Sequence, residues 1–213
     1  MRVGVLGTGD VGRALGGGFV TLGHEVLIGS RTSSNVKANA WVKEMGPKAS
    51  AGTFADAASY GEVLVLATLG TANEQAMRSA GLERLRGKLL IDTTNPLDFS
   101  AGTPRLAVTG NDSGGEIVQR LVPEARVVKA FNTVGNAHMF RPSFPGGPPD
   151  MFICGNDELA KEKTGEILRD FGWGVVDVGG IDASRYLEAM CMVWVLYGIR
   201  RNRWNHAFKL LEK

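Results

Sequence analysis

The sequence predicts an α/β protein with a mainly parallel sheet, and three observations support that class. Short apolar runs rich in Val, Ile and Leu alternate with longer stretches of helix-like spacing. Most of these runs are apolar at consecutive positions, as in strands that are buried on both faces. The chain has 213 residues, of which 44% are hydrophobic and 22% charged, enough for one substantial core and at most a small appendage.

The predicted elements follow one another in regular alternation. The strands are Val3–Leu6, Glu25–Ile28, Val63–Ala67, Leu89–Asp92, Arg126–Lys129 and Met151–Cys154. The helices are Val11–Leu22, Val36–Met45, Ala72–Ala80, Gly114–Leu121 and Leu159–Phe171. This order predicts a parallel sheet with helices on both faces. We place the boundary near Gly179 and Gly180, so that residues 1–180 form the sheet domain and residues 181–213 a helical C-terminal segment.

Composition excludes several functional classes. A formal net charge of +2 does not favour a nucleic-acid or membrane partner. Cys154 and Cys191 form no metal-binding or CxxC spacing, which predicts a reduced, cytoplasmic chain without a metal site. No secretory signal is expected at the N-terminus. The apolar stretch Ala189–Ile199 is shorter than the roughly 20 residues of a membrane span and is predicted to be a buried helix.

The N-terminal stretch MRVGVLGTGDVGRALGGGF carries a phosphate-binding pattern. A strand leads directly into Gly7-Thr8-Gly9-Asp10-Val11-Gly12, and a helix follows. We expect Gly7 to allow a tight turn, Gly9 to let a pyrophosphate approach the backbone, and Gly12 to let helix and strand pack closely. The helix N-terminus adds N–H donors and a positive dipole end. Asp10 is expected to face solvent or to cap the helix.

The end of the next strand predicts which dinucleotide binds. NAD-specific sites place a carboxylate there for the ribose 2′-hydroxyl, but the segment from Gly29 to Asn35 contains no acid. Arg31 can hold a 2′-phosphate through charge-assisted hydrogen bonds, and Ser30 and Thr32 add hydroxyl donors. These residues predict NADP(H), while Lys37 is either a further phosphate contact or a surface residue.

Three later loops follow predicted strand ends, where open α/β sheets bind ligands. They are Thr68-Leu69-Gly70, Thr93-Thr94-Asn95-Pro96 and Phe131-Asn132-Thr133. Their amides and hydroxyls suit a ribose or a carboxamide, although polar residues are common in any loop. Lys129 ends a strand, and spacing suggests no acidic partner for it. His138 follows the third loop and is a weak candidate for reaching the substrate, whereas no obligatory acid or base is expected.

Several segments together resemble the NADP oxidoreductase, coenzyme F420-dependent family, to which the cytosolic domain of the STEAP metalloreductases is related. They are GTGDVGRALGGGFVTLGHEVLIGSR, IDTTNPLDFS, VVKAFNTVG, FICGND and SRYLEAM, in order over nearly the whole chain. The resemblance implies a Rossmann-type, doubly wound domain with a short C-terminal helical extension closing over the nicotinamide. It implies that Thr8, Gly9, Asp10 and Val11 hold the pyrophosphate, and Ser30 and Arg31 the 2′-phosphate. By the same resemblance, Thr68, Leu69 and Gly70 lie along the ribose, with Asn95 and Asn132 nearer the nicotinamide.

The resemblance leaves the hydride acceptor open. F420 is the first candidate, a free flavin or ferric acceptor is the second, and a binding protein without turnover is the third. The apolar helix from Tyr186 to Ile199, with Trp194, is predicted to form either the acceptor wall or the core of a homodimer. The basic cluster of Arg200, Arg201 and Arg203, with Trp204, serves either the acidic tail of F420 or a solvated or subunit-facing surface.

Overall fold

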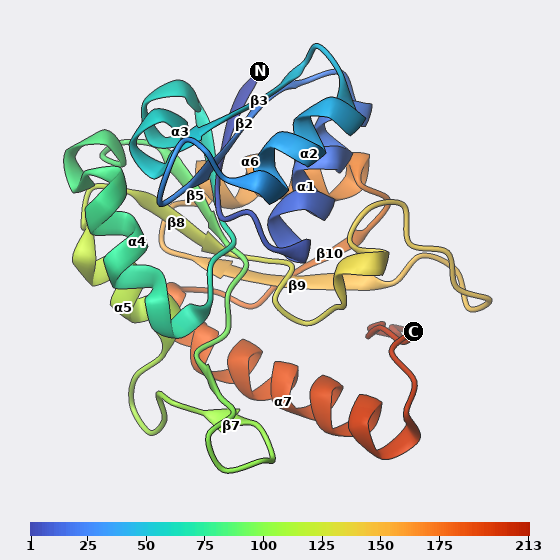
Figure 1. Ribbon diagram of the computed structural model, residues 1–213. Helices are drawn as coiled ribbons and strands as arrows, with labels where there is room; N and C mark the ends of the chain where they lie inside the picture. Colours follow the sequence, from blue (N-terminus) through green and yellow to red (C-terminus); the bar gives the residue numbers. More distant parts are fainter.

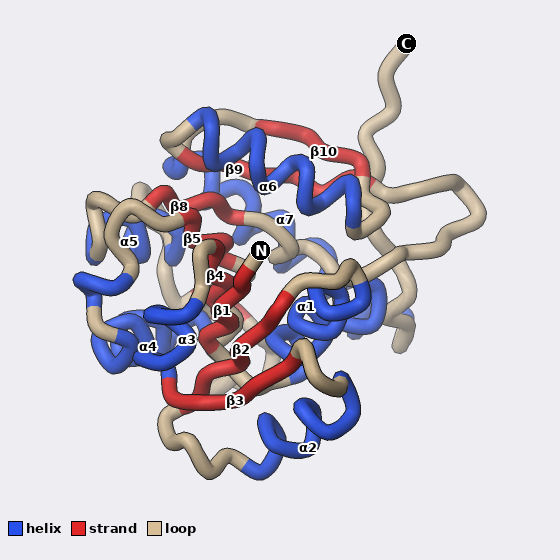
Figure 2. The backbone as a smooth tube through the Cα atoms, turned by 90° about the horizontal axis from the view of Figure 1, so that it is seen from above, coloured by secondary structure: helices blue, strands red, loops and turns tan.

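The central sheet runs in the order β10-β9-β8-β5-β4-β1-β2-β3 in this computed structural model, which describes residues 1–213 (Figure 2). Its strands are β1 Arg2–Leu6, β2 Glu25–Ser30, β3 Ala49–Thr53, β4 Val63–Leu66, β5 Leu89–Asp92, β8 Arg126–Lys129, β9 Asp150–Gly155 and β10 Gly174–Asp177. The strands from β8 to β3 are all parallel, whereas β9 runs antiparallel to β8. The prediction of a doubly wound, mainly parallel sheet is therefore confirmed.

Helices cover both faces of the sheet (Figures 1 and 2). One apolar cluster joins the sheet to α1 Asp10–Thr21, α2 Val36–Met45 and α6 Glu158–Asp170. A second cluster joins the opposite face to α3 Phe54–Tyr60, α4 Asn73–Ala80 and α5 Gly114–Leu121. Short 3₁₀ turns lie at η1 Gly70–Ala72, η2 Leu82–Arg84, η3 Asn136–His138 and η4 Ile181–Ala183.

The strand register brings the loops of the predicted site to one edge. Leu6 of β1 lies opposite Leu66 of β4, Leu66 lies opposite Asp92 of β5, and Asp92 lies opposite Lys129 of β8. Each of these residues is the last of its strand. Successive strands are added on one side of β1 as far as β3 and on its other side from β4 onward, so the strand order reverses between β1 and β4, where open α/β sheets form their ligand crevice.

Several elements were missed at the level of sequence. Strand β3 has the sequence ASAGT, with only Ala49 and Gly52 buried, so it lacks the Val, Ile and Leu that mark the other strands. Helix α3 and strand β10 were also missed. So was a small hairpin formed by β6 Leu97–Asp98 and β7 Arg105–Leu106, which projects next to the last helix (Figure 1).

The C-terminal segment is helical only in part. Helix α7 spans Ser184–Arg201 and lies across one end of the sheet domain (Figure 1). Asn202 ends it in the left-handed conformation, and the remaining residues form no helix, so the prediction of helix to the end of the chain is wrong. This tail returns toward β9, where the Asp150 N–H donates to the Phe208 carbonyl at 2.9 Å. Leu187 of α7 belongs to the second apolar cluster, so the helix shares that core. No helix has both the length and the hydropathy of a membrane span.

Candidate functional site

A cavity of about 670 Å³ opens at the carboxyl ends of β1, β4 and β5. Its lining includes most of the residues that the sequence singled out: Gly7, Thr8, Gly9, Asp10, Val11, Arg31, Thr68, Leu69, Gly70 and Asn95. Thr93 and Thr94 of the predicted loop also line it. Leu97, Phe99 and Asn136 line it as well, and these three residues were not indicated by the sequence. The structure thus brings residues from the segments after β1, β2, β4, β5 and β8 to one concave surface.

The three glycines of the N-terminal loop differ in what a side chain at each position would contact. Gly7 has φ +136°, and a Cβ there would collide with the Ala67 carbonyl. A Cβ on Gly12 would collide with the Gly7 carbonyl, which is the close packing of helix and strand that we expected. At Gly9 a Cβ would meet no protein atom within 4 Å. Because the protein itself does not need a glycine there, the open space beside Gly9 fits an approaching ligand.

The N-terminus of α1 faces the cavity with free donors. Gly9 is its N-cap residue, and no side chain caps the first turn. The first N–H groups of the helix and its dipole are therefore available to an anion. The Asp10 carboxylate pairs with Arg13 and its side chain is 70% exposed, so the solvent-facing interpretation of Asp10 is confirmed.

A second hollow, of about 450 Å³, adjoins the first at the end of β2. Its lining residues are Thr8, Ser30, Arg31, Thr32, Asn35 and Phe54. The Ser30 hydroxyl donates to the Thr32 carbonyl and accepts from the Thr32 N–H, which closes the turn around Arg31. The Arg31 guanidinium forms no ion pair within the chain and is exposed, whereas Lys37 lies outside the lining. Arg31 is thus a free cation in a polar hollow.

The loops after β4 and β5 are tied together beneath the cavity. The Thr68 hydroxyl donates to Asn73 Oδ1, and Asn73 Nδ2 donates to the Thr94 hydroxyl, both at 2.7 Å. A Cβ on Gly70 would collide with the Asn95 carbonyl, so Gly70 lets the two loops touch. Their polar side chains therefore hold one another in place beside the cavity.

Other predicted residues lie behind the lining. Asn132 is buried and bonds Asn95, and the Thr133 hydroxyl lies against Met151 Sδ. Pro96 packs near Gly114, and Gly12 is internal to the α1–β1 contact. The ring of His138 lies against Phe144, 5.1 Å between ring centroids, and does not line the cavity. Direct cofactor contacts by these residues remain predictions.

The expectation that Lys129 has no acidic partner is wrong. Its ammonium lies 2.8 Å from Asp92 Oδ2 and 3.0 Å from Glu188 Oε1, and all three side chains are buried. Burial disfavours the lysine charge, but the two carboxylates outweigh burial and raise the pKa of Lys129. Glu188 comes from α7, far along the chain. The sequence did contain one indication of an acidic partner, the lysine itself, because a charged residue at the end of a buried apolar strand needs a partner of opposite charge.

The aromatic cluster near the C-terminus is separate from the cavity. Trp194 stacks on His206, 4.6 Å between ring centroids, and lies 5.3 Å from the Trp204 ring. Its indole N–H donates to the His206 carbonyl. Neither tryptophan lines the cavity, nor does any arginine of the basic cluster, so Trp194 fastens the tail to α7 instead of forming a cavity wall.

The cavity therefore belongs to a Rossmann-type dinucleotide-binding protein. A glycine-rich loop and a helix N-terminus face one part of it, a free arginine stands where NAD-specific proteins place an acid, and neutral polar residues line the rest. The comparisons with known proteins agree with this class. Residues 2–96 match the family model described as NADP oxidoreductase coenzyme F420-dependent.

Three relatives illustrate the match. The F420-dependent NADP reductase of Methanocaldococcus jannaschii is 30% identical over 206 residues, which cover 89% of each protein. A crystal structure of a presumed F420-dependent NADP reductase from Arthrobacter sp. FB24 is 39% identical, with a TM-score of 0.94 over the whole of both chains. Metalloreductase STEAP3 of Rattus norvegicus is 29% identical over 89% of this chain, which spans only 36% of that protein. The chain belongs to the F420-dependent NADP oxidoreductase family and is an NADP-dependent oxidoreductase.

Proposed function

We propose that this protein transfers a hydride between NADP(H) and a flavin-like acceptor, with the deazaflavin F420 as the first candidate. The observation that carries the proposal is the chemistry of the cavity lining. Asp10 and Arg31 are its only titratable residues, and both belong to the phosphate-binding segments. Hydride transfer to a conjugated ring depends on positioning and electrostatics, and an obligatory acid or base is not needed.

The residues present fit NADP(H). We assign the pyrophosphate to the loop Gly7–Gly12 and the α1 N-terminus, where the space beside Gly9 is open. The 2′-phosphate is assigned to Arg31, with the Ser30 and Thr32 turn beside it. Thr68, Leu69 and Gly70 are assigned to the ribose. Bound NADPH supplies the hydride, and the chain's own residues hold and orient it.

The nicotinamide end is assigned to Asn95, supported from behind by Asn132. The Asn132 Oδ1 atom is buried and has no hydrogen-bond partner within the chain. An orphaned acceptor beside a lining residue is consistent with a carboxamide N–H as its missing donor.

The acceptor wall is assigned to the β6–β7 hairpin. Leu97 and Phe99 line the cavity from this hairpin, near Asn95 and Asn136. Phe99 is 60% exposed, so its ring is accessible to a bound ligand at the rim of the cavity. An aromatic ring at the rim suits offset stacking with a flavin-like ring.

A homodimer is part of the proposal. Helix α7 exposes Tyr186, Val193, Leu196 and Tyr197, whose spacing places them along one side of the helix. Because exposed apolar stripes of this kind mark contact surfaces, a second copy of the chain is the partner we infer. Light scattering on the wild type and on Val193→Glu tests this: a dimer that becomes a monomer is expected, and a monomeric wild type contradicts it.

The decisive experiment mixes the protein anaerobically with NADPH and F420 and follows the deazaflavin absorbance, with FMN and FAD in parallel. Rapid loss of the F420 band alone supports the first candidate. Turnover with FMN or FAD alone favours the second candidate, a flavin or ferric reductase, for which the STEAP3 relative is the specific support. No oxidation of NADPH with any of the three acceptors would contradict the proposal and favour a binding protein without turnover. Gly9→Val serves as the control for background reduction.

A further inference from the structure

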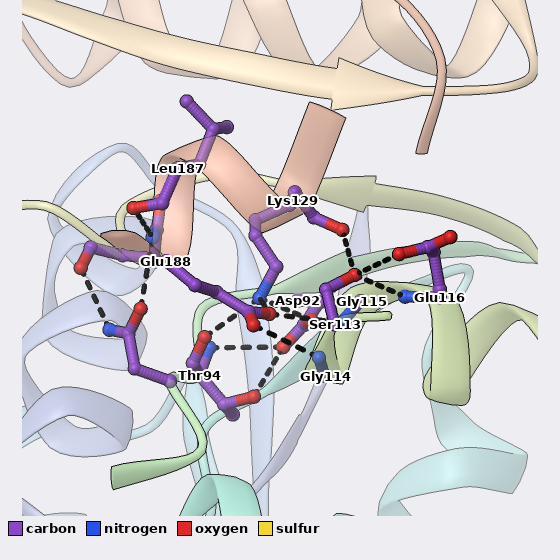
Figure 3. Close-up of polar contacts among 12 residues, drawn as sticks. Asp92, Thr94, Ser113, Gly114, Gly115, Glu116, Lys129, Leu187 and Glu188 are labelled. Atoms are coloured by element: carbon purple, nitrogen blue, oxygen red, sulfur yellow. Dashed lines mark hydrogen bonds and ion pairs between the residues drawn. The ribbon is translucent and has the colours of Figure 1, made fainter. Parts of the chain in front are cut away.

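A buried group of polar side chains lies just behind the cavity and is centred on Lys129 (Figure 3). The lysine side chain is fully buried, and its ammonium has three oxygen partners within the chain. It forms ion pairs with Asp92 Oδ2 at 2.8 Å and Glu188 Oε1 at 3.0 Å, and it donates a hydrogen bond to the Thr94 carbonyl at 2.8 Å. Lys129 thus contacts a lining residue directly while lying outside the cavity itself.

Asp92 forms two further hydrogen bonds with Thr94. Its Oδ1 atom accepts from the Thr94 N–H at 3.0 Å and from the Thr94 hydroxyl at 2.7 Å. Together with Lys129, the carboxylate therefore occupies the N–H, the hydroxyl and the carbonyl of a single cavity residue (Figure 3). The next residue is Asn95, so the backbone that presents Asn95 to the cavity is set by these contacts.

Glu188 connects the same group to helix α7. Its two oxygens accept from the N–H groups of Gly114 and Gly115 at 3.0 Å each, at the N-terminus of α5 (Figure 3). Gly115 is needed because a Cβ there would lie 2.9 Å from Lys129 Cε and 2.6 Å from Ser184 Oγ. One carboxylate therefore seats α7 on α5 and reaches the lysine that holds Thr94.

Stability alone does not account for three buried charges. Removing such groups from water is costly, and apolar side chains of the same volume often stabilise a protein equally well. What a buried network of ion pairs and hydrogen bonds adds is a single defined geometry. Here the geometry in question is the position of Thr94 and Asn95 at the end of the cavity.

We propose that Lys129 is a positioning residue for hydride transfer, which links the seating of α7, through Glu188, to the Thr94–Asn95 segment that presents the nicotinamide end of the cavity. The proposal rests on the proposed function for its kinetic consequence. Its structural consequence, a segment fixed by Lys129, can be measured without any acceptor.

Two variants test the link, each with a matched control. Lys129→Met removes the charge and keeps an unbranched side chain. Glu188→Gln keeps the shape, removes the α7 charge and is the milder change should Lys129→Met fold poorly. Val118→Ala in α5 and Cys191→Ala in α7 are controls, since both residues are buried nearby and have no part in the network or the cavity.

The first readouts need no turnover. We expect hydrogen exchange at the Thr94 and Asn95 amides to rise on the order of 10-fold or more in both test variants, relative to controls of equal thermal stability. NADPH affinity, measured by calorimetry, is expected to stay within about threefold, because the phosphate-binding residues are untouched. The fluorescence lifetime of bound NADPH, which reports how rigidly the nicotinamide is held, is expected to shorten.

Kinetics then separates positioning from folding. With the acceptor that the wild type reduces, single-turnover hydride transfer is expected to slow roughly 10- to 100-fold in Lys129→Met, as for a small misplacement of reacting groups. The isotope effect with C4-deuterated NADPH is expected to grow. If exchange, lifetime and rate in both test variants match the controls, Lys129 is only a structural residue. If the wild type reduces no acceptor, the proposed function fails, while exchange and lifetime still decide whether Lys129 fixes this segment.

Discussion

The side chains of Asn95 and Asn132 bond each other's loops reciprocally. Asn95 Nδ2 donates to the Asn132 carbonyl at 2.8 Å, and Asn132 Nδ2 donates to Asn95 Oδ1 at 3.0 Å. The second N–H of Asn132 Nδ2 reaches the Leu187 carbonyl of α7 at 2.9 Å. The loops after β5 and β8 and the last helix therefore meet in one pair of side chains, of which only Asn95 lines the cavity.

Asn132→Ala is expected to affect both stability and catalysis. It leaves Asn95 Oδ1 without its donor and removes the side-chain hydrogen bond to the Leu187 carbonyl of α7, which costs about 1–3 kcal/mol of unfolding free energy. Because Asn95 loses its lateral support, hydride transfer is expected to slow by about tenfold. Urea unfolding and single-turnover kinetics measure the two effects.

Thr133→Val is the matched control. The Thr133 hydroxyl has only Met151 Sδ as its partner, at 3.8 Å, so removing it is expected to leave NADPH affinity and the transfer rate unchanged. Weaker NADPH binding in this variant would indicate that Thr133 contacts the cofactor after all. An unchanged transfer rate in Asn132→Ala would remove Asn132 from the site.

The part of the site that could be predicted from sequence is the part made by local signals. The turn at Gly7–Gly12 and the loops that follow Leu66 and Asp92 are each marked by a strand of consecutive apolar residues. Parallel strands must end at the same edge, so the residues after them meet. The role of the arginine after β2 could be predicted because one position, carboxylate or not, distinguishes an NAD site from an NADP site.

What could not be predicted depends on contacts between distant segments. Glu188 is the only acidic residue of a mostly apolar helix, and its neighbours in the sequence do not indicate that it reaches Lys129. Phe99 directly follows β6 in a hairpin whose two strands have only two residues each, too few to show strand periodicity. For Trp194 the sequence left two interpretations, an acceptor wall or a dimer core, and the wall is not found because the indole stacks on His206 of the tail, a contact between distant segments.

Arg31→Ala is expected to weaken NADPH binding by about 1.5–3 kcal/mol, roughly 10- to 150-fold, as for a charged hydrogen bond. NADH binding is expected to stay nearly unchanged, because NADH has no 2′-phosphate for Arg31 to contact. Calorimetric titration of both cofactors measures the difference. Lys37→Ala is the control for general loss of positive charge, since Lys37 lies outside the hollow. An equal loss of affinity for NADPH and NADH would contradict the assignment of the 2′-phosphate.

Gly9→Val is expected to abolish binding of both cofactors while the protein stays folded. The Gly9 backbone is extended, which suits valine, and its Cβ would point into space that no protein atom occupies. Gly12→Ala is the contrasting variant, because its Cβ meets the Gly7 carbonyl and overpacking of this kind costs about 1–3 kcal/mol. Thermal unfolding and calorimetry together distinguish the two. Normal NADPH binding by Gly9→Val would remove the glycine-rich loop from the site.

The hairpin that carries Phe99 is expected to keep its geometry down to low pH. Hydrogen bonds from Ser100 and then from Arg105 lower the pKa of Asp98 to about 2, from 3.8 for the free side chain. A lowered carboxylate pKa stabilises the folded hairpin fully above pH 3.8, and this contribution is lost as the pH falls through about 2. Exchange of the Ser100 amide, which donates to Asp98 Oδ1 at 2.9 Å, should therefore show its loss of protection in that interval.

Asp98→Asn applies the same test at neutral pH. It removes the ion pair with Arg105, 2.8 Å between nitrogen and oxygen, and leaves Phe99 on a looser hairpin. If Phe99 forms the acceptor wall, the KM for the acceptor is expected to rise about 3- to 10-fold while NADPH affinity stays unchanged. Phe99→Ala is expected to raise the same KM further, and Phe99→Tyr to restore it, because the stacking surface is kept. A KM that is equal in Phe99→Ala and the wild type would place the acceptor elsewhere, since no other aromatic residue of the cavity lies on this hairpin.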